Sequence, residues 1–323
     1  MMTQKKPKGR WASKSKAPAE SQGTPKYQDP KKKSRPKSKK WGRGRHRQPE
    51  KFYDFHEADD RISDIFRHHE FAQFPHEKRH QLTRFYQLLM ENQRKDNLTR
   101  LLSIRDVTIK HFIDSLIVTR FVDLRFPLLD MGTGPGFPGI PLKIQFPDHP
   151  IILAEGVEKR IRFLKQVRES LGLKDLQIIG RFVTPDFVYP VPAIITRAVA
   201  DVSETLSNIS NCLQPEGILY LMKGPNVDEE IRLAETKWKG YFRLEKDVAY
   251  SLPATPHQRR LLVYRKIKST EVLLTENPAS LHPTHAPAPR WLTPHGNWSY
   301  LLHKMAQTES RQALAPPALF HQA

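Results

Sequence analysis

The sequence has little of what disulfide-bonded and membrane proteins contain. Cys212 is the single cysteine among 323 residues, so no disulfide can form within the chain, and a zinc module built from several cysteines is excluded. Charged residues interrupt every long apolar run, whereas a membrane-spanning helix needs about 18–20 consecutive apolar residues. The N-terminus also lacks the apolar core of a secretory signal. We therefore expect a soluble, cytoplasmic protein without a membrane anchor.

Acidic residues are scarce at the start of the chain. Residues 1–50 hold 17 Lys and Arg against 3 Asp and Glu, a net charge of +14, so the rest of the chain contributes only +5 of the total of +19. Six prolines and few large apolar side chains predict a disordered arm, because such a segment buries too little apolar surface to fold. A basic arm suits a polyanion, since contacts with phosphate release counterions. A solubility tail and a segment that binds acidic lipid remain as alternatives.

Large apolar residues are also few in residues 268–323, where seven prolines and five histidines stand. These histidines have no regular ligand spacing, so we expect no metal and interpret the segment as a low-complexity C-terminal tail. The folded domain is then residues 51–267, with a helical lead-in over 51–125 and an α/β core over 126–267.

The apolar pattern of residues 51–267 predicts alternating helices and strands. Apolar residues at i, i+3 and i+4 spacing predict helices over 76–95, 103–122, 157–171, 202–213 and 228–238. Short apolar runs predict strands over 127–130, 151–154, 176–179, 193–196 and 218–222, and a closing pair over 242–250 and 260–265. Alternating units of this length predict a mostly parallel sheet that helices cover on both faces.

The strongest chemical signal is a glycine-rich turn after the strand that ends at Asp130. Four of the eight residues from Gly132 to Gly139 are glycine, which allows a sharp turn and close approach of a ligand to the backbone. Ligands of open α/β sheets bind at the carboxyl ends of the strands. A dinucleotide site requires a glycine where Phe137 stands, and two prolines crowd the helix start that would hold a pyrophosphate. We therefore predict S-adenosylmethionine, which brings a cation and a nucleoside but no phosphate, at Asp130, Gly132 and Gly134.

Charged residues follow several of the other strands. Glu155 ends the second strand, where a carboxylate can accept hydrogen bonds from ribose hydroxyls or stabilise a helix N-terminus. Lys159 and Arg160 begin the next helix against the dipole preference, so we predict a phosphate-facing role for one of them, with a solvated face as the alternative. Arg197 and Lys223 end two later strands and could meet RNA phosphate or the cofactor carboxylate, or form structural ion pairs.

Ordered motifs make the chain resemble a known family. They are Asn97-Leu98-Thr99, Lys110–Leu116, Gly132–Pro141, Glu158–Leu164, Thr196-Arg197-Ala198 and Met222-Lys223-Gly224. Their order and spacing resemble the RsmG (GidB) family of small-subunit ribosomal RNA methyltransferases. The resemblance implies a class I methyltransferase fold, an α/β, Rossmann-like fold with a mostly parallel seven-stranded sheet. It also implies methyl transfer from S-adenosylmethionine to N7 of a guanine in the decoding-region loop of 16S rRNA, with the small ribosomal subunit as partner.

The resemblance implies cofactor contacts as well. It assigns these to Gly132, Phe137, Glu155 and Arg197. One departure stands after the third strand, where the family has Arg-Ala-Glu and its last two residues flank the adenine. This sequence has Phe182 and Val183 at those two places, so the carboxylate is missing unless Asp186 replaces it.

The implied chemistry requires little from the protein besides positioning. Guanine N7 carries a lone pair and no proton, so we expect no catalytic base or nucleophile and interpret His111 and Asp114 as structural. The alternative function is a catalytically decayed methyltransferase fold that binds rRNA or assists ribosome assembly. A small-molecule methyltransferase would leave the basic arm unexplained. We expect a monomer.

Overall fold

The structure is a computed structural model that describes residues 48–49, 51–197 and 199–269. Nearly all of the predicted arm and tail (residues 1–50 and 268–323) therefore lies outside the described residues, and their disorder remains a prediction. Within the described part, no helix has both the length and the apolar character needed to cross a membrane.

The lead-in consists of helices whose starts and ends follow from local residues. Asp54 caps α1 (Phe55–His68) by accepting a 2.8 Å hydrogen bond from the Glu57 amide, and Asn97 in the left-handed conformation ends α2 (His76–Asp96). A third helical stretch consists of α3 (Ile104–Val107), a π-helical turn η1 (Thr108–Ile113), α4 (Asp114–Leu116) and a 3₁₀ turn η2 (Ile117–Arg120). The helices predicted over 76–95 and 103–122 are thus confirmed.

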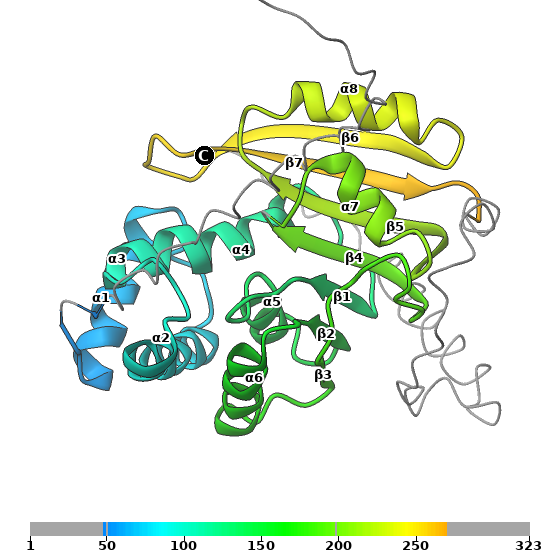
Figure 1. Cartoon of the computed structure of the whole chain (residues 1–323). Coiled ribbons are helices and arrows are strands. Elements are labelled where there is room, and N and C mark those ends of the chain that lie inside the picture. The colour runs from blue at the N-terminus through cyan, green and yellow to red at the C-terminus, as the bar shows by residue number, and fades with distance from the viewer. Residues whose placement is uncertain (1–47, 50, 198, 270–323) are drawn as a thin grey trace, which may run out of the picture. The chain divides into compact units, whose positions relative to one another are not determined.

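Strands and helices alternate through the rest of the domain. They are β1 (Leu128–Met131), α5 (Gly139–Gln145), β2 (Ile151–Ala154), α6 (Glu158–Ser170), β3 (Leu176–Ile179), β4 (Val191–Arg197), α7 (Val202–Asn208), β5 (Leu213–Lys223), α8 (Asp228–Lys237), β6 (Phe242–Ser251) and β7 (Gln258–Lys266). The strands form one sheet in the order β3-β2-β1-β4-β5-β7-β6 (Figure 1). Strands β1 to β5 are parallel, and β7 runs antiparallel between β5 and β6. The predicted α/β fold with a mostly parallel seven-stranded sheet is confirmed.

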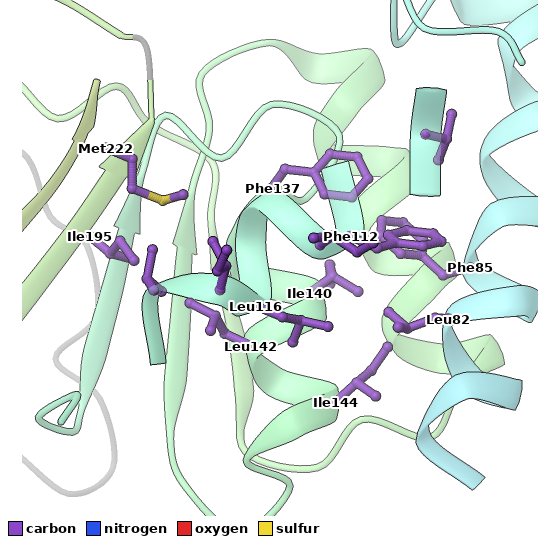
Figure 2. Packing of buried hydrophobic residues seen from close by; sticks show 14 of the residues in the cluster. Leu82, Phe85, Phe112, Leu116, Phe137, Ile140, Leu142, Ile144, Ile195 and Met222 are labelled. Carbon is purple, nitrogen blue, oxygen red and sulfur yellow. The ribbon is translucent and has the colours of Figure 1, made fainter. Parts of the chain in front are cut away.

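Each face of the sheet carries its own hydrophobic core. Alternate strand residues point to opposite faces, so Leu128 and Ile151 belong to one core and Leu129 and Ile152 to the other. The first core includes the lead-in helices, α5 and α6, and Figure 2 shows aromatic residues such as Phe85, Phe112 and Phe137 gathered there. The second core includes α7 and α8. Helices therefore cover both faces, as the sequence pattern predicts.

The sequence-based boundary between α7 and β5 is wrong. Pro215 and Gly217 predict a helix that continues to residue 213 and a strand that begins at 218, whereas α7 ends at Asn208 and β5 begins at Leu213. The reason is a bulge. The pairing with β4 moves from Val191↔Leu213 to Ala193↔Ile218, so the proline and the glycine fall where the ladder is interrupted and a missing N–H costs little.

The strand order positions the functional site. It reverses direction at β1, because β2 follows on one side of β1 and β4 on the other. The crossover helices on the two sides leave from opposite faces, which opens a crevice at the carboxyl ends of β1 and β4. The glycine-rich turn that follows β1 lies at this crevice.

Candidate active site

A cavity of about 750 Å³ lies at the carboxyl ends of the parallel strands. Its volume falls within the range of about 300–1,000 Å³ that is usual for small-molecule sites. Its walls come from the loop between α2 and α3, the π-helical turn, the glycine-rich turn, and the ends of β2, β4, β5 and β7. The residues are Leu98, Thr99, Arg100, Leu101, Lys110, His111, Asp114, Gly132, Thr133, Gly134, Pro135, Phe137, Glu155, Arg160, Phe182, Arg197, Val199, Met222, Lys223, Gly224 and Arg259.

The glycine-rich turn needs its glycines for two different reasons. Gly132 and Gly134 have φ of +67° and +62°, a region that L side chains rarely adopt. A Cβ on Gly132 would lie 2.8 Å from Val199 Cγ2, so this position is closed by the protein itself. A Cβ on Gly134 would meet no atom of the described residues within 4 Å, so its missing side chain leaves open space in the cavity. The turn therefore forms a cradle that fits a ligand lying directly against the backbone.

Glu155 fixes the turn to the start of α6. Its carboxylate is buried and accepts hydrogen bonds from the Gly134 amide at 3.0 Å and the Val157 amide at 2.8 Å. Arg160 Nη1 lies 3.4 Å from the same carboxylate. Both oxygens already have backbone partners, so a ribose hydroxyl would share an oxygen with one of these amides.

An exposed aromatic ring stands at the end of β3. Phe182 is 60% exposed, and its ring covers Gly156, where a Cβ would lie 2.3 Å from the ring. Because Phe182 lines the cavity, one of its faces is available for stacking with a purine. Val183, by contrast, is buried in the second core and does not line the cavity. Asp186 pairs with Arg181 at 2.7 Å and does not line the cavity either, so it does not supply the missing carboxylate.

One buried carboxylate organises two arginines on the opposite wall. Asp114 Oδ2 lies 3.0 Å from Arg197 Nη1, and Asp114 Oδ1 lies 3.1 Å from Arg259 Nε. Arg197 also donates to the Lys110 carbonyl at 3.1 Å and to His111 Nδ1 at 3.0 Å. The structural ion pair that the sequence left open for Arg197 is therefore present, at a position that still lines the cavity.

Basic side chains outnumber acidic ones around the cavity. The lining includes six Lys and Arg residues (Arg100, Lys110, Arg160, Arg197, Lys223 and Arg259) against two carboxylates, Asp114 and Glu155. Lys223 forms a 2.6 Å ion pair with Glu230 and donates to the Ala200 carbonyl at 2.9 Å. Lys159 does not line the cavity, since its ammonium group donates to the Asp96 carbonyl at the end of α2. The excess of positive charge suits a ligand that carries phosphate or carboxylate groups.

Comparison with known proteins identifies the family. The family model described as "GidB: rRNA small subunit methyltransferase G" matches residues 78–262. A protein of Bdellovibrio bacteriovorus named "Ribosomal RNA small subunit methyltransferase G 2" is 58% identical over 226 residues, which is 70% of this chain and 89% of that protein. The chain belongs to the rRNA small subunit methyltransferase G family.

More distant relatives carry the same name. A "Ribosomal RNA small subunit methyltransferase G" of Carboxydothermus hydrogenoformans is 37% identical over 194 residues, or 58% of this chain and 83% of that protein. A "Ribosomal RNA small subunit methyltransferase G 2" of Syntrophobacter fumaroxidans is 42% identical over 187 residues, which cover 58% of this chain and only 38% of that longer protein. Membership confirms the predicted family, the enzyme class of an rRNA methyltransferase, and S-adenosylmethionine as the cofactor.

The structure brings most of the predicted site residues together. Those that line the cavity are Gly132, Gly134, Phe137, Glu155, Arg160, Phe182, Arg197 and Lys223. Asp130, Val183 and Lys159 lie outside the lining, and Asp130 acts through the turn, because its Oδ2 accepts a 2.7 Å hydrogen bond from the Gly139 amide. Whether these residues bind the cofactor or RNA remains a prediction.

Sequence reasoning missed the loop before α3 and the start of β7. Leu98 and Thr99 belong to a motif that the family shares, yet only the fold shows that this loop lines the cavity. Arg259 carries no motif at all. Its position follows from the antiparallel register of β7, which pairs Arg260 with Lys223 at the end of β5.

A group of possible metal ligands lies in the lead-in. Within the described residues, Asp59, His76 and His80 bring one ligand atom each within 4.8 Å of one another. Asp59 already pairs with Arg79 at 3.0 Å and accepts a 2.9 Å hydrogen bond from Thr83. Because the guanidinium opposes a second cation at this carboxylate, we assign no metal to the group.

Asp130 provides a test of the electrostatics beneath the turn. Burial raises the pKa of Asp130 to about 7 from 3.8, although the hydrogen bond from the Gly139 amide opposes the shift. Between about pH 4 and pH 7, Asp130 therefore keeps its proton in the folded protein and has lost it in the unfolded chain. Because the unfolded state binds fewer protons there, the free energy of unfolding should fall as the pH rises through this range. Asp130→Asn removes this titration. We expect the wild type to lose roughly 2–4 kcal/mol relative to Asp130→Asn between pH 5 and 8, measured by urea unfolding. Parallel pH dependence of the two proteins would contradict the buried, titrating carboxyl.

Proposed function

We propose that the protein transfers a methyl group from S-adenosylmethionine to N7 of a guanine in the decoding-region loop of 16S rRNA, in the small ribosomal subunit. Family membership carries this proposal. The cavity supports it, because it lies at the switch point of the sheet and has an excess of basic side chains. A small-molecule methyltransferase would not require this excess.

The two walls of the cavity suit the two ligands. On one wall, the open space at Gly134, the carboxylate of Glu155 and the exposed ring of Phe182 fit a nucleoside with its methionine chain. On the other wall, Arg197 and Arg259 are held by Asp114, and Arg100 is exposed on the loop between α2 and α3. We assign the first wall to the cofactor, and we assign Arg100 and Arg259 of the second wall to the phosphates that flank the target guanine. Phe137 and Arg197 remain predicted cofactor contacts.

The protein's own residues need only position the reactants. S-adenosylmethionine supplies an electrophilic methyl group on a sulfonium, and guanine N7 offers a lone pair with no proton to remove. The most obvious candidate for a base is His111, but its Nδ1 lone pair already accepts a hydrogen bond from Arg197. Holding the two reacting atoms about 3–3.5 Å apart in a dry cavity then accounts for the catalysis.

Phe182 and Val183 stand where the family has alanine and glutamate, and this difference is the reason to consider a second, non-enzymatic function. A fold that had lost its cofactor site would still present the basic cavity and would act as an rRNA-binding or assembly protein. Phe182 favours the enzyme, because its exposed ring offers an apolar face where the family's alanine offers only a methyl group.

Two measurements on the full chain test the proposal. Calorimetry should show saturable binding of S-adenosylmethionine, and small subunits from a strain that lacks this protein should accept a labelled methyl group on one guanine. If the protein binds small subunits but calorimetry detects no binding of S-adenosylmethionine, the decayed methyltransferase is favoured. Methyl transfer to a small molecule in the absence of RNA would contradict the assigned substrate.

The regions outside the described residues keep their proposed roles. We propose that residues 1–50 add salt-sensitive, sequence-independent affinity for RNA to the methyltransferase domain of residues 51–267. The support is the charge distribution, since the arm carries +14 of the net charge of +19. Specificity then belongs to the folded domain.

A further inference from the structure

His111 lines the cavity on the wall that carries Arg197 and Arg259, in the π-helical turn of the lead-in. Such turns are rare and occur frequently at functional sites. The imidazole stacks on the ring of Phe137 with 4.1 Å between centroids and an interplanar angle of 10°. Its two nitrogens contact different parts of the cavity: Nδ1 lies 3.0 Å from Arg197 Nη2, and Nε2 lies 3.0 Å from Thr99 Oγ1.

The chemistry of these two partners determines where the imidazole proton lies. A guanidinium only donates, so the contact with Arg197 requires an unprotonated Nδ1. The single proton of a neutral imidazole is then on Nε2, where it is donated to Thr99 Oγ1. Burial and the adjacent Arg197 charge lower the pKa of His111 well below its ordinary value of 6.5, which agrees with a neutral ring.

The partners on either side of His111 are themselves fixed. Arg197 is bound to Asp114, which also binds Arg259. Thr99 Oγ1 accepts a 3.1 Å hydrogen bond from the Leu101 amide, and the Thr99 amide donates to Gln93 Oε1 at 2.9 Å. His111 thus links the arginine pair, at the end of β4 and the start of β7, to the loop of residues 97–101. This loop carries Leu98, Thr99, Arg100 and Leu101 into the lining.

We propose that His111, neutral and protonated on Nε2, is a positioning residue that holds the loop of residues 97–101 and Arg197 in the arrangement that receives the RNA. It does not take a proton from the substrate. The assignment of this wall to RNA rests on the proposed function, whereas the tautomer and the link do not. Two of the predicted cofactor contacts, Phe137 and Arg197, touch His111 itself. Loss of the bond to Thr99 alone should therefore weaken RNA binding, whereas loss of the bond to Arg197 should weaken cofactor binding as well.

Nuclear magnetic resonance of the full chain labelled with ¹⁵N-histidine tests the tautomer directly. His111→Asn identifies the resonances of this ring. We expect a neutral ring with the proton on Nε2, unchanged between about pH 8 and pH 6. A ring that carries its proton on Nδ1, or that titrates near its ordinary value of 6.5, would overturn the proposal.

Two variants separate the two hydrogen bonds. His111→Asn places an amide oxygen near the Nδ1 position and keeps an acceptor for Arg197, whereas His111→Gln places an amide nitrogen near Nε2 and keeps a donor for Thr99. His111→Asn should raise the KM for small subunits about tenfold, as expected for one lost hydrogen bond, and change the Kd of S-adenosylmethionine less than about twofold. His111→Gln loses the bond to Arg197, a predicted cofactor contact, and should raise both the KM for subunits and the Kd of the cofactor. His111→Asn should also accelerate hydrogen exchange of the Leu101 amide, and His111→Gln should not.

The matched control is a buried histidine outside the cavity. His69 is 2% exposed, and its Nδ1 lies 2.5 Å from the Pro253 carbonyl oxygen. His69→Gln should leave the KM for subunits and the Leu101 exchange unchanged. Equal effects of the His69 and His111 variants, or an effect on cofactor binding alone, would overturn the positioning role. If the wild type methylates no subunit, the proposed function fails, while the resonances and the Leu101 exchange still decide whether His111 forms the link.

Discussion

Replacing Gly134 with leucine is expected to abolish binding of S-adenosylmethionine, with a Kd raised about 100-fold or more. Within the described part of the chain, the new side chain would meet no atom near its Cβ and would therefore occupy the open space of the cavity itself. Overpacking a site in this way costs roughly 3 kcal/mol, which corresponds to the predicted loss of affinity. Isothermal titration calorimetry measures it directly.

The control for this substitution is Gly172, which follows α6 and does not line the cavity. Its φ is +59°, close to that of Gly134, and a Cβ there would also meet none of the atoms that the structure describes within 4 Å. Gly172→Leu therefore adds a similar backbone strain of about 1–2 kcal/mol without filling the cavity. It should lower the free energy of unfolding and leave the Kd unchanged. Normal cofactor affinity in Gly134→Leu would show that the cofactor does not lie against the glycine-rich turn.

Replacing Asp114 with asparagine should destabilise the protein and disable the RNA-facing wall together. Asp114 is 2% exposed and accepts hydrogen bonds from both Arg197 and Arg259. An asparagine offers one oxygen and turns its amide nitrogen toward the other guanidinium, which leaves a buried charge without a counter-charge. We expect the free energy of unfolding to fall by about 3–5 kcal/mol and methyl transfer to subunits to fall with it.

Asp247 offers a matched substitution at a partly exposed ion pair. Its carboxylate receives Arg260 at 2.5 and 2.6 Å, yet the pair is screened by water. Asp247→Asn should cost less than about 1 kcal/mol and preserve methyl transfer. Urea unfolding of both variants makes the comparison, and equal losses would contradict the organising role of Asp114.

Local sequence patterns predict the strands and helices that carry the site. The element boundaries that they predict wrongly depend on pairing between strands that are distant in the sequence. The strands β2 and β3 have the predicted bounds, because each is a short apolar run between polar turns and pairs in parallel register with its neighbour over its whole length. The start of β5 was missed because Pro215 and Gly217 read locally as a helix stop, while the bulge opposite β4 is a property of the register.

In the candidate site, too, the locally determined features could be predicted from the sequence and the long-range contacts could not. The turn from Gly132 to Gly139 could be recognised from spacing alone, since the need for glycine is local. The role of Asp114 could not, because both arginines that it binds are more than 80 residues away along the chain. Val183 was predicted at the adenine through alignment with a motif, but its place beside an exposed Phe182 turns its side chain into the second core.

A mass-spectrometric map of modified guanines in small-subunit rRNA, from cells with and without this protein, tests the central claim most directly. The account predicts one N7-methylated guanine in the decoding-region loop that disappears with the protein and returns when the wild-type gene is restored. It also predicts that Gly134→Leu does not restore the methyl group, whereas Gly172→Leu does. An identical set of methylated guanines in the two strains would contradict the assigned function.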